Sequence, residues 1–233
     1  SNDVTITGGT IGGTVYGGYV SKDGNAAENK VTVTDGTIGG ATGGDTTSGD
    51  ATDNEITIAG GKIDGDVIGG RSENGNAADN NVKIAGGETT GDVYGGYAGG
   101  KGNVSDNKIT ITGGSVDGSL YGGFTADGTA SGNEITLSAG TVDRVIGGYA
   151  ENGEAYGNKI NFAGGKVTGD VILNAVGTGS VKGSTFEITD KAEVGGTVYS
   201  AYVSKDGSAE NNKLTISGGN IGGATAGYTN KGN

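Results

Sequence analysis

The sequence predicts an all-β protein whose fold is a parallel β-solenoid, a three-sided β-helix of about nine coils with roughly 26 residues each. One unit recurs through the whole chain, each unit carries short segments in which apolar and polar residues alternate, and no segment has a helical period. We therefore treat residues 1–233 as a single repeat domain. The coils are predicted to begin near residues 2, 29, 54, 80, 107, 133, 158, 184 and 212.

The first segment of each unit alternates with a period of two, as in Val31-Thr32-Val33. Such alternation indicates a half-buried strand. A Gly-Gly corner follows, and then a second strand with two inward columns, represented by Ile38 and Val67. A third, shorter stretch carries a small apolar residue such as Ala77.

A single unit cannot bury its own apolar face, so the units are expected to stack and to pair each strand with the coils above and below. Glycine at the corners permits the tight bends. The recurring Asn is expected to form a ladder of side-chain amides at a buried corner. Its members are Asn29, Asn54, Asn80, Asn107, Asn133, Asn158 and Asn212, with Ser184 in place of Asn in one unit.

The composition excludes several classes of function. The chain has no His, Cys, Pro, Met or Trp, which removes the usual nucleophilic triads, zinc sites and disulfides. The net charge of −12 disfavours nucleic acid and anionic membranes as partners. No apolar run is long enough for a membrane span, so we expect no membrane insertion by this segment. We expect no cofactor and no metal, because the Gly-rich calcium-binding repeat pattern is missing and the acids alternate with Thr, Ser and Lys.

Two neighbouring columns on the second strand are rich in aromatic residues and are predicted to form an aromatic stripe along the rod. One interpretation is that the strand bends at Gly-Gly and the aromatics close the corner. The other is an exposed surface that binds protein or sugar. The stripe consists of Tyr16, Tyr19, Tyr94, Tyr97, Tyr121, Phe124, Tyr149, Tyr199 and Tyr202.

Outward Thr pairs such as Thr5/Thr7 and Thr110/Thr112 resemble the flat arrays of ice-binding proteins, but Lys83 and Glu187 interrupt the column. Ordinary exposed strand residues explain the pattern more simply. A polysaccharide-cleaving enzyme is also disfavoured, because its groove needs long loop insertions and every coil here has 25 to 28 residues.

The units NKITITGGSVDGSLYGGF and NEITIAGGKIDGDVIGGR resemble the Gly-rich repeats of bacterial autotransporter passengers and related secreted adhesins. This resemblance implies export, a β-helical stalk, an extracellular or bacterial cell-surface location and attachment to host cells, other bacteria or a matrix. The missing Met predicts that the chain was processed or excised from a longer one, with any targeting segment outside it.

The sequence thus predicts a non-enzymatic, extracellular structural and adhesive segment, with a host or bacterial surface protein or glycan, or further copies of itself, as its partner. No capping segment is expected within the first or the last coil, which suits either a slice of a longer rod or ends that meet other copies. A self-assembling fibre subunit that stacks end to end is therefore an alternative, and an ice-binding protein is another.

Overall fold

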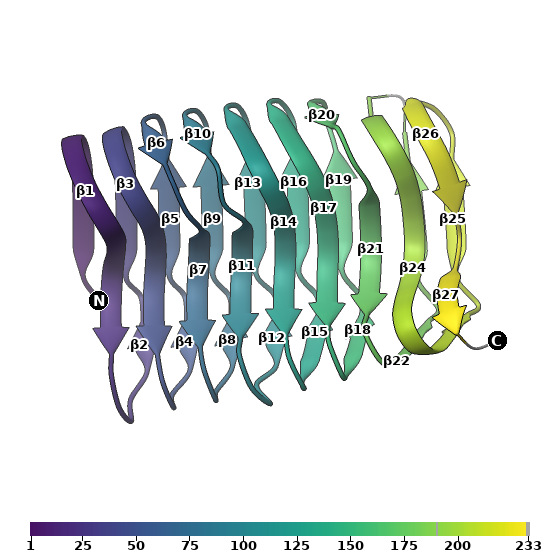
Figure 1. Cartoon of the computed structure of the whole chain (residues 1–233), viewed down its shortest axis with the longest axis horizontal. Helices are drawn as coiled ribbons and strands as arrows, with labels where there is room; N and C mark the ends of the chain where they lie inside the picture. Colours follow the sequence, from purple (N-terminus) through teal and green to yellow (C-terminus); the bar gives the residue numbers. More distant parts are fainter. Residues whose placement is uncertain (190, 232–233) are drawn as a thin grey trace.

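The computed structural model describes residues 1–189 and 191–231. Within them it contains only β-structure, wound into a parallel solenoid of about nine turns (Figure 1). The predicted fold class is therefore confirmed. Each turn passes through a back wall, a front wall and a floor. Strands of neighbouring coils pair in parallel, as β5 pairs with β9, except between β18 and β22 and between β19 and β23.

The back wall holds the first segment of each coil. Two long strands, β1 and β3, continue from the back wall through the front wall. The back-wall strands are β1 (Asp3–Val20), β3 (Lys30–Thr46), β5 (Glu55–Ile58), β9 (Asn81–Ile84), β13 (Lys108–Ile111), β16 (Glu134–Leu137), β19 (Lys159–Phe162), β23 (Thr185–Ile188) and β25 (Lys213–Ile216).

The front wall holds the second segment, which is either one long strand or two short ones. Its strands are β6 (Lys62–Ile63), β7 (Val67–Ser72), β10 (Glu88–Thr89), β11 (Val93–Ala98), β14 (Ser115–Thr125), β17 (Thr141–Ala150), β20 (Lys166–Val167), β21 (Val171–Val176), β24 (Glu193–Glu210), β26 (Asn220–Thr225) and β27 (Tyr228–Lys231). In the eighth coil, β24 also continues into the floor.

The floor holds the third, shorter segment of each coil. Its strands are β2 (Ala26–Ala27), β4 (Ala51–Thr52), β8 (Ala77–Ala78), β12 (Val104–Ser105), β15 (Thr129–Ser131), β18 (Glu154–Tyr156) and β22 (Gly179–Lys182).

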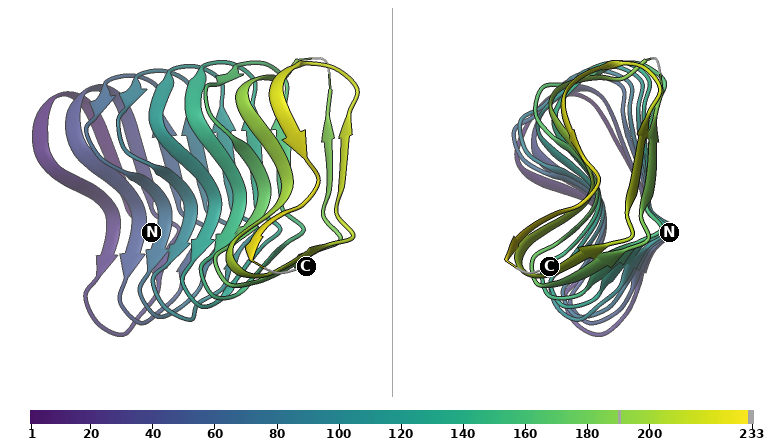
Figure 2. Two further views of the ribbon diagram at one scale, coloured as in Figure 1. Left: turned by 45° about the vertical axis from the view of Figure 1, so that its right-hand side comes forward. Right: turned by 90° about the vertical axis from the view of Figure 1, so that its right-hand side faces the viewer.

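The front wall bends inward at its middle, so the cross-section has a waist between a large lobe and a small one (Figure 2). The large lobe is filled by a core of Val, Ile and Leu side chains, including Ile56 and Leu120. The small lobe holds Ala and Val, including Ala130 and Val181. Small side chains suit the narrow lobe because protein interiors are filled to nearly crystalline density.

The two walls meet at the waist, where the Asn ladder on one side touches the Gly-Gly pairs of the other. A Cβ on Gly96 would lie 2.6 Å from the amide nitrogen of Asn107. This contact explains why the second strand carries glycine at these positions, because any side chain there would displace the ladder.

Candidate functional site

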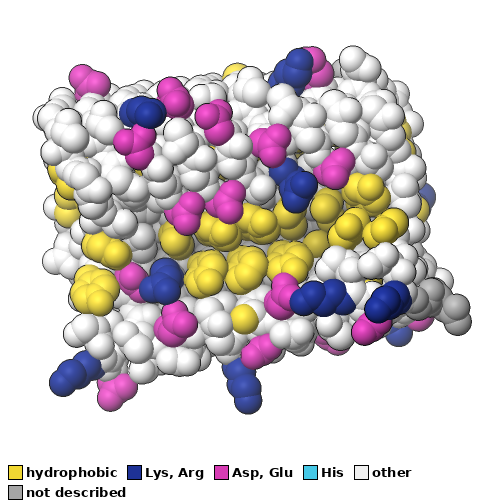
Figure 3. Space-filling view, in the orientation of Figure 1, with side chains coloured by type: hydrophobic (Ala, Val, Ile, Leu, Met, Phe, Trp, Pro, Cys, Tyr) yellow, Lys and Arg dark blue, Asp and Glu magenta, His cyan; other side chains and the backbone are white. Residues whose placement is uncertain are grey.

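The aromatic stripe lies on the outer surface of the front wall, in the concave waist (Figure 3). In β11, Val93 and Ala98 point into the core, whereas Tyr94 and Tyr97 are only partly buried. Two glycines separate the tyrosines, and the strand bends there. The strand therefore bends at its Gly-Gly pair, and the aromatic columns on either side of the bend face solvent. The contact between these glycines and the Asn ladder closes the corner behind the rings.

Rings of successive coils stack on one another through the middle of the rod. The centroids of Tyr94 and Tyr121 lie 4.9 Å apart with planes 7° from parallel. Those of Tyr97 and Phe124 lie 5.0 Å apart at 6°, and Phe124 and Tyr149 lie 5.3 Å apart. Within one coil the two rings meet edge to face, as Tyr94 and Tyr97 do at 5.4 Å and 86°. Stacking covers the ring faces, so the stripe presents ring edges and hydroxyl groups to solvent.

The ends of the stripe are more open than its middle. Tyr16 and Tyr19 form an edge-to-face pair at 5.3 Å, and they are 40% and 63% exposed. At the other end, Tyr199 and Tyr202 pair at 5.3 Å. Tyr228, which the repeat places in the same column as Tyr202, stacks on it at 4.7 Å and extends the stripe by one coil.

Two coils near the N-terminal end interrupt the aromatic columns. The register aligns Tyr19 with Asp45 and Asp45 with Arg71. Asp45 is only 5% exposed and forms an ion pair with Arg71 at 3.2 Å, and Thr42 lies beside it. These smaller or polar side chains leave a hollow of about 190 Å³, which Tyr16 and Ile68 also line.

Charged groups on the rim of the stripe form hydrogen bonds with its tyrosines and affect their pKa values. The Tyr94 hydroxyl donates to Asp92 at 3.1 Å, and burial, followed by the nearby Asp92, raises the pKa of Tyr94. Burial also raises the pKa of Tyr149, whose hydroxyl donates to Glu151. Tyr94 and Tyr149 therefore remain protonated hydrogen-bond donors at neutral pH. The Arg71 guanidinium lies 5.7 Å from the centre of the Tyr97 ring, a cation–π contact.

Arg71 also forms a 2.9 Å ion pair with Glu73, while burial is the main cause of a raised pKa for Asp45. This end of the stripe is consequently polar, and its charges are paired on the rim.

The recurring Asn residues form a continuous amide ladder from Asn2 to Asn158. Each amide nitrogen donates to the carbonyl oxygen of the next Asn, as from Asn80 to Asn107 and from Asn107 to Asn133, both at 2.9 Å. The same carbonyl oxygen also accepts from a backbone N–H, as from that of Asn80 at 3.0 Å. A second amide hydrogen reaches the floor, where Asn107 donates to Ala77 at 3.0 Å. The residues of the ladder are buried in the middle of the rod and hold the waist.

The sequence interpretation missed a second column, directly before the ladder, where the backbone is left-handed. Asp53, Asp79 and Asp106 all have φ of 57°, and Gly132 and Gly157 occupy the same position with similar angles. Only Gly, Asn and Asp visit this region readily. The recurrence of acids, Asn and Gly at one position of the repeat was the signal.

It also missed a substitution between the two walls. Where Ser184 replaces Asn in the ladder, Leu173 and Asn174 replace the facing glycines. Asn174 accepts from the amide of Asn158 at 2.6 Å and donates to the Ser184 hydroxyl at 2.8 Å. The missing amide is thus supplied from the opposite wall.

Comparison of the chain with protein-family models, curated proteins and solved structures gives no significant match. Across residues 1–189 and 191–231, no group of three acidic, His or Cys side chains is arranged to hold a metal ion. A helix of the length and hydropathy needed to cross a membrane is also absent from this described part.

Proposed function

We propose that this chain is a non-enzymatic, structural and adhesive segment of an extracellular bacterial protein, and that the aromatic stripe is its contact surface. The observation that supports the proposal most directly is the solvent-facing position of the stripe along a rigid solenoid. Aromatic side chains dominate the binding free energy of many interfaces. Exposure of an apolar strip to water is energetically unfavourable, so such a strip marks a surface that binds a partner. The N-terminal end of the stripe, where Tyr16 and Tyr19 are most exposed, offers the largest free ring surface.

The solenoid suits a structural role because the hydrogen bonds that stabilise it are spread over all of its coils. Every coil pairs with its neighbours through backbone bonds, and the amide ladder adds a second set of bonds along the axis. The raised pKa values of Tyr94 and Tyr149 also argue against a tyrosine nucleophile, which requires the ionised form at working pH. The autotransporter resemblance, the end-to-end fibre and ice binding remain predictions. For ice binding, the register places Lys83 between Thr57 and Thr110 in the outward column.

The test measures binding of the labelled chain to immobilised mucin, fibronectin, laminin and collagen. We expect saturable binding to at least one of them, and we expect Tyr16→Ser combined with Tyr19→Ser to weaken it at least tenfold. Tyr156→Ser is the matched control, because Tyr156 is 51% exposed and lies on the floor, away from the stripe. Equal loss in the control variant, or no binding to any of the four, would count against the proposal.

A further inference from the structure

The parallel ladder is interrupted at one place on the back wall and floor. The strand β19 pairs with β16, and β23 pairs only with β25. On the floor, β18 is the last strand of a six-stranded sheet, and the next strand, β22, pairs with β24 instead. Within the described residues, no backbone pairing connects the β18–β19 stretch to the β22–β23 stretch. The two coils remain joined through the front wall, where β21 pairs with β24.

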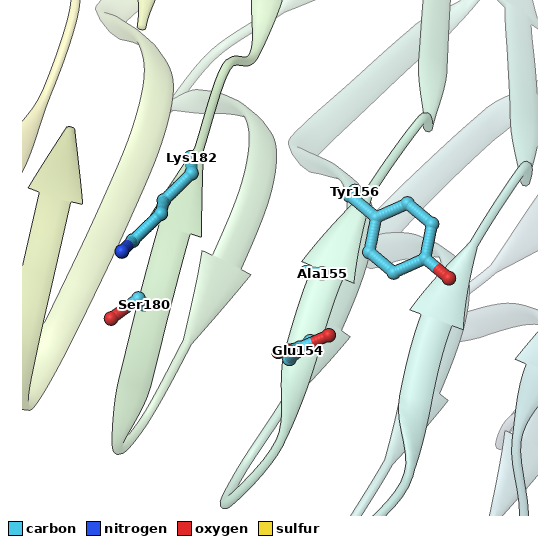
Figure 4. Close-up of a pocket in the computed structure, with 5 residues that line it drawn as sticks. All are labelled: Glu154, Ala155, Tyr156, Ser180 and Lys182. Carbon is cyan, nitrogen blue, oxygen red and sulfur yellow. The ribbon is translucent and has the colours of Figure 1, made fainter. Parts of the chain in front are cut away.

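Three hollows follow this break. One of about 340 Å³ lies between β18 and β22 (Figure 4), where Tyr156 and Lys182 turn away from each other. A second of about 360 Å³ is lined by Asn158, Leu173 and Phe186. A third of about 240 Å³ lies between Ile160 and Glu187. The second and third hollows share Ile160, Asn161 and Glu187 in their linings, and we call the break along which all three lie the slot.

The sequence explains why the slot forms here. Leu173 and Asn174 put side chains where the six preceding coils have a Gly-Gly pair, and Ser184 has no amide of its own, so the ladder reaches it only through Asn174. In the preceding coil, a Cβ on Gly148 would lie 2.3 Å from the Asn158 amide nitrogen, so added bulk at this position separates the walls.

Two strand edges therefore face each other across the slot, each with backbone groups that the neighbouring coils would otherwise satisfy. Lys159 N–H donates to Asn133 at 2.8 Å, on the side away from the slot, and Lys213 N–H donates to Ser184 at 2.7 Å beyond it. Among residues 1–189 and 191–231, no equivalent backbone bond crosses the slot, and the side chain of Asn174 links Asn158 to Ser184 across it. Unpaired edges of this kind are templates for an added strand.

We propose that this slot accepts an extended peptide strand from a partner chain, running parallel to β19 and β23, with the pattern apolar–basic–apolar. The repeat register sets Ile160 opposite Phe186 and Phe162 opposite Ile188, so two inward side chains of the added strand must be apolar. Its central outward side chain would lie between Asn161 and Glu187. Glu187 is exposed and forms no ion pair within the described residues, so a Lys at that position is complementary.

Insertion of a strand requires the two edges to stand about 9.6 Å apart, which is two strand spacings. The paired front wall serves as the hinge for that opening. The inferred site lies on the back wall, on the opposite side of the waist from the aromatic stripe, and does not depend on the proposed adhesive function.

The probe is the peptide NNVKIAGG, the sequence of residues 80–87, labelled for fluorescence anisotropy. In its own coil this segment lies between two neighbouring strands with Lys83 facing outward, bonded to Glu55 at 3.3 Å. We expect saturable one-to-one binding to the full chain, and at least about fivefold weaker binding when the peptide Lys is replaced by Glu.

The matched variant is Glu187→Lys, an exposed position that leaves the fold unchanged. It should reverse the preference, so that the Glu peptide binds more tightly than the Lys peptide. The triple variant Leu173→Gly, Asn174→Gly and Ser184→Asn, which restores the repeat pattern and closes the slot, should abolish binding of both peptides. The Tyr16→Ser/Tyr19→Ser variant should bind the peptide normally, which separates this inference from the adhesive proposal.

The proposal is wrong if the original chain does not bind the peptide, if Glu187→Lys leaves the preference unchanged, or if the triple variant binds equally well. It is also wrong if light scattering shows a dimer that the peptide does not dissociate, because a second copy of the chain would then occupy the slot.

Discussion

Replacing Asn107 by Ala tests how much the amide ladder contributes to stability. Asn107 is fully buried. Its carbonyl oxygen accepts from both the backbone N–H and the amide of Asn80, and its amide donates to Ala77 and Asn133. The substitution leaves the Asn80 N–H and one Asn80 amide hydrogen without partners, whereas the Ala77 carbonyl keeps its pairing with β12. At about 1–3 kcal/mol for each of the two orphaned buried groups, the expected loss is about 2 to 6 kcal/mol.

The assay is urea unfolding followed by circular dichroism, with hydrogen exchange of β13 as a local readout, because repeat proteins can unfold in parts. Asn76→Ala is the matched control. Asn76 is exposed, and its side chain accepts only from the Asn103 N–H at 2.9 Å. This control should lose less than about 1 kcal/mol. If Asn107→Ala loses no more than Asn76→Ala, the ladder does not hold the waist.

Three further predictions follow from the same contacts. Gly96→Ala should destabilise the chain by about 2 to 4 kcal/mol because its Cβ would lie 2.6 Å from the Asn107 amide, whereas Gly12→Ala, which meets no atom within 4 Å, should be nearly neutral in the same urea titration. Burial, then Asp53 and Asp106, raise the pKa of Asp79 above 3.8. The native chain therefore binds this proton more tightly than the unfolded chain, and the resulting stability is lost as pH rises through the raised pKa. The stabilisation by Asp79→Asn should be largest at pH 7 and should shrink on acidification; a pH-independent difference in urea midpoint would contradict this. Closing the slot with Leu173→Gly, Asn174→Gly and Ser184→Asn should slow hydrogen exchange in β19 and β23, while Ser184→Asn alone should destabilise the chain because the new amide meets Asn174.

The solenoid could be predicted from the sequence because the pattern of apolar, polar and glycine residues that produces it recurs in every coil. Alternating pairs such as Val31 and Val33 fix the inward face, and both are fully buried. The back-wall, front-wall and floor strands follow the three segments of the repeat, and the coil spacing sets the parallel register.

The orientation of the aromatic columns could not be settled in the same way. Two adjacent apolar residues on one strand are compatible with a corner or with a bend, and only the contact between Gly96 and Asn107 decides between them. The slot was harder still, because it depends on Asn174 compensating for Ser184 across the waist, a relation between residues in different walls.

The most direct test of this account is hydrogen–deuterium exchange of the intact chain, resolved by peptide. We predict strong protection of the backbone amides in β9, β13 and β16, which pair on both sides, and much faster exchange in β19 and β23, which pair on one side only. Uniform protection across all five strands would contradict the interrupted ladder, and weak protection of β13 would contradict the solenoid itself.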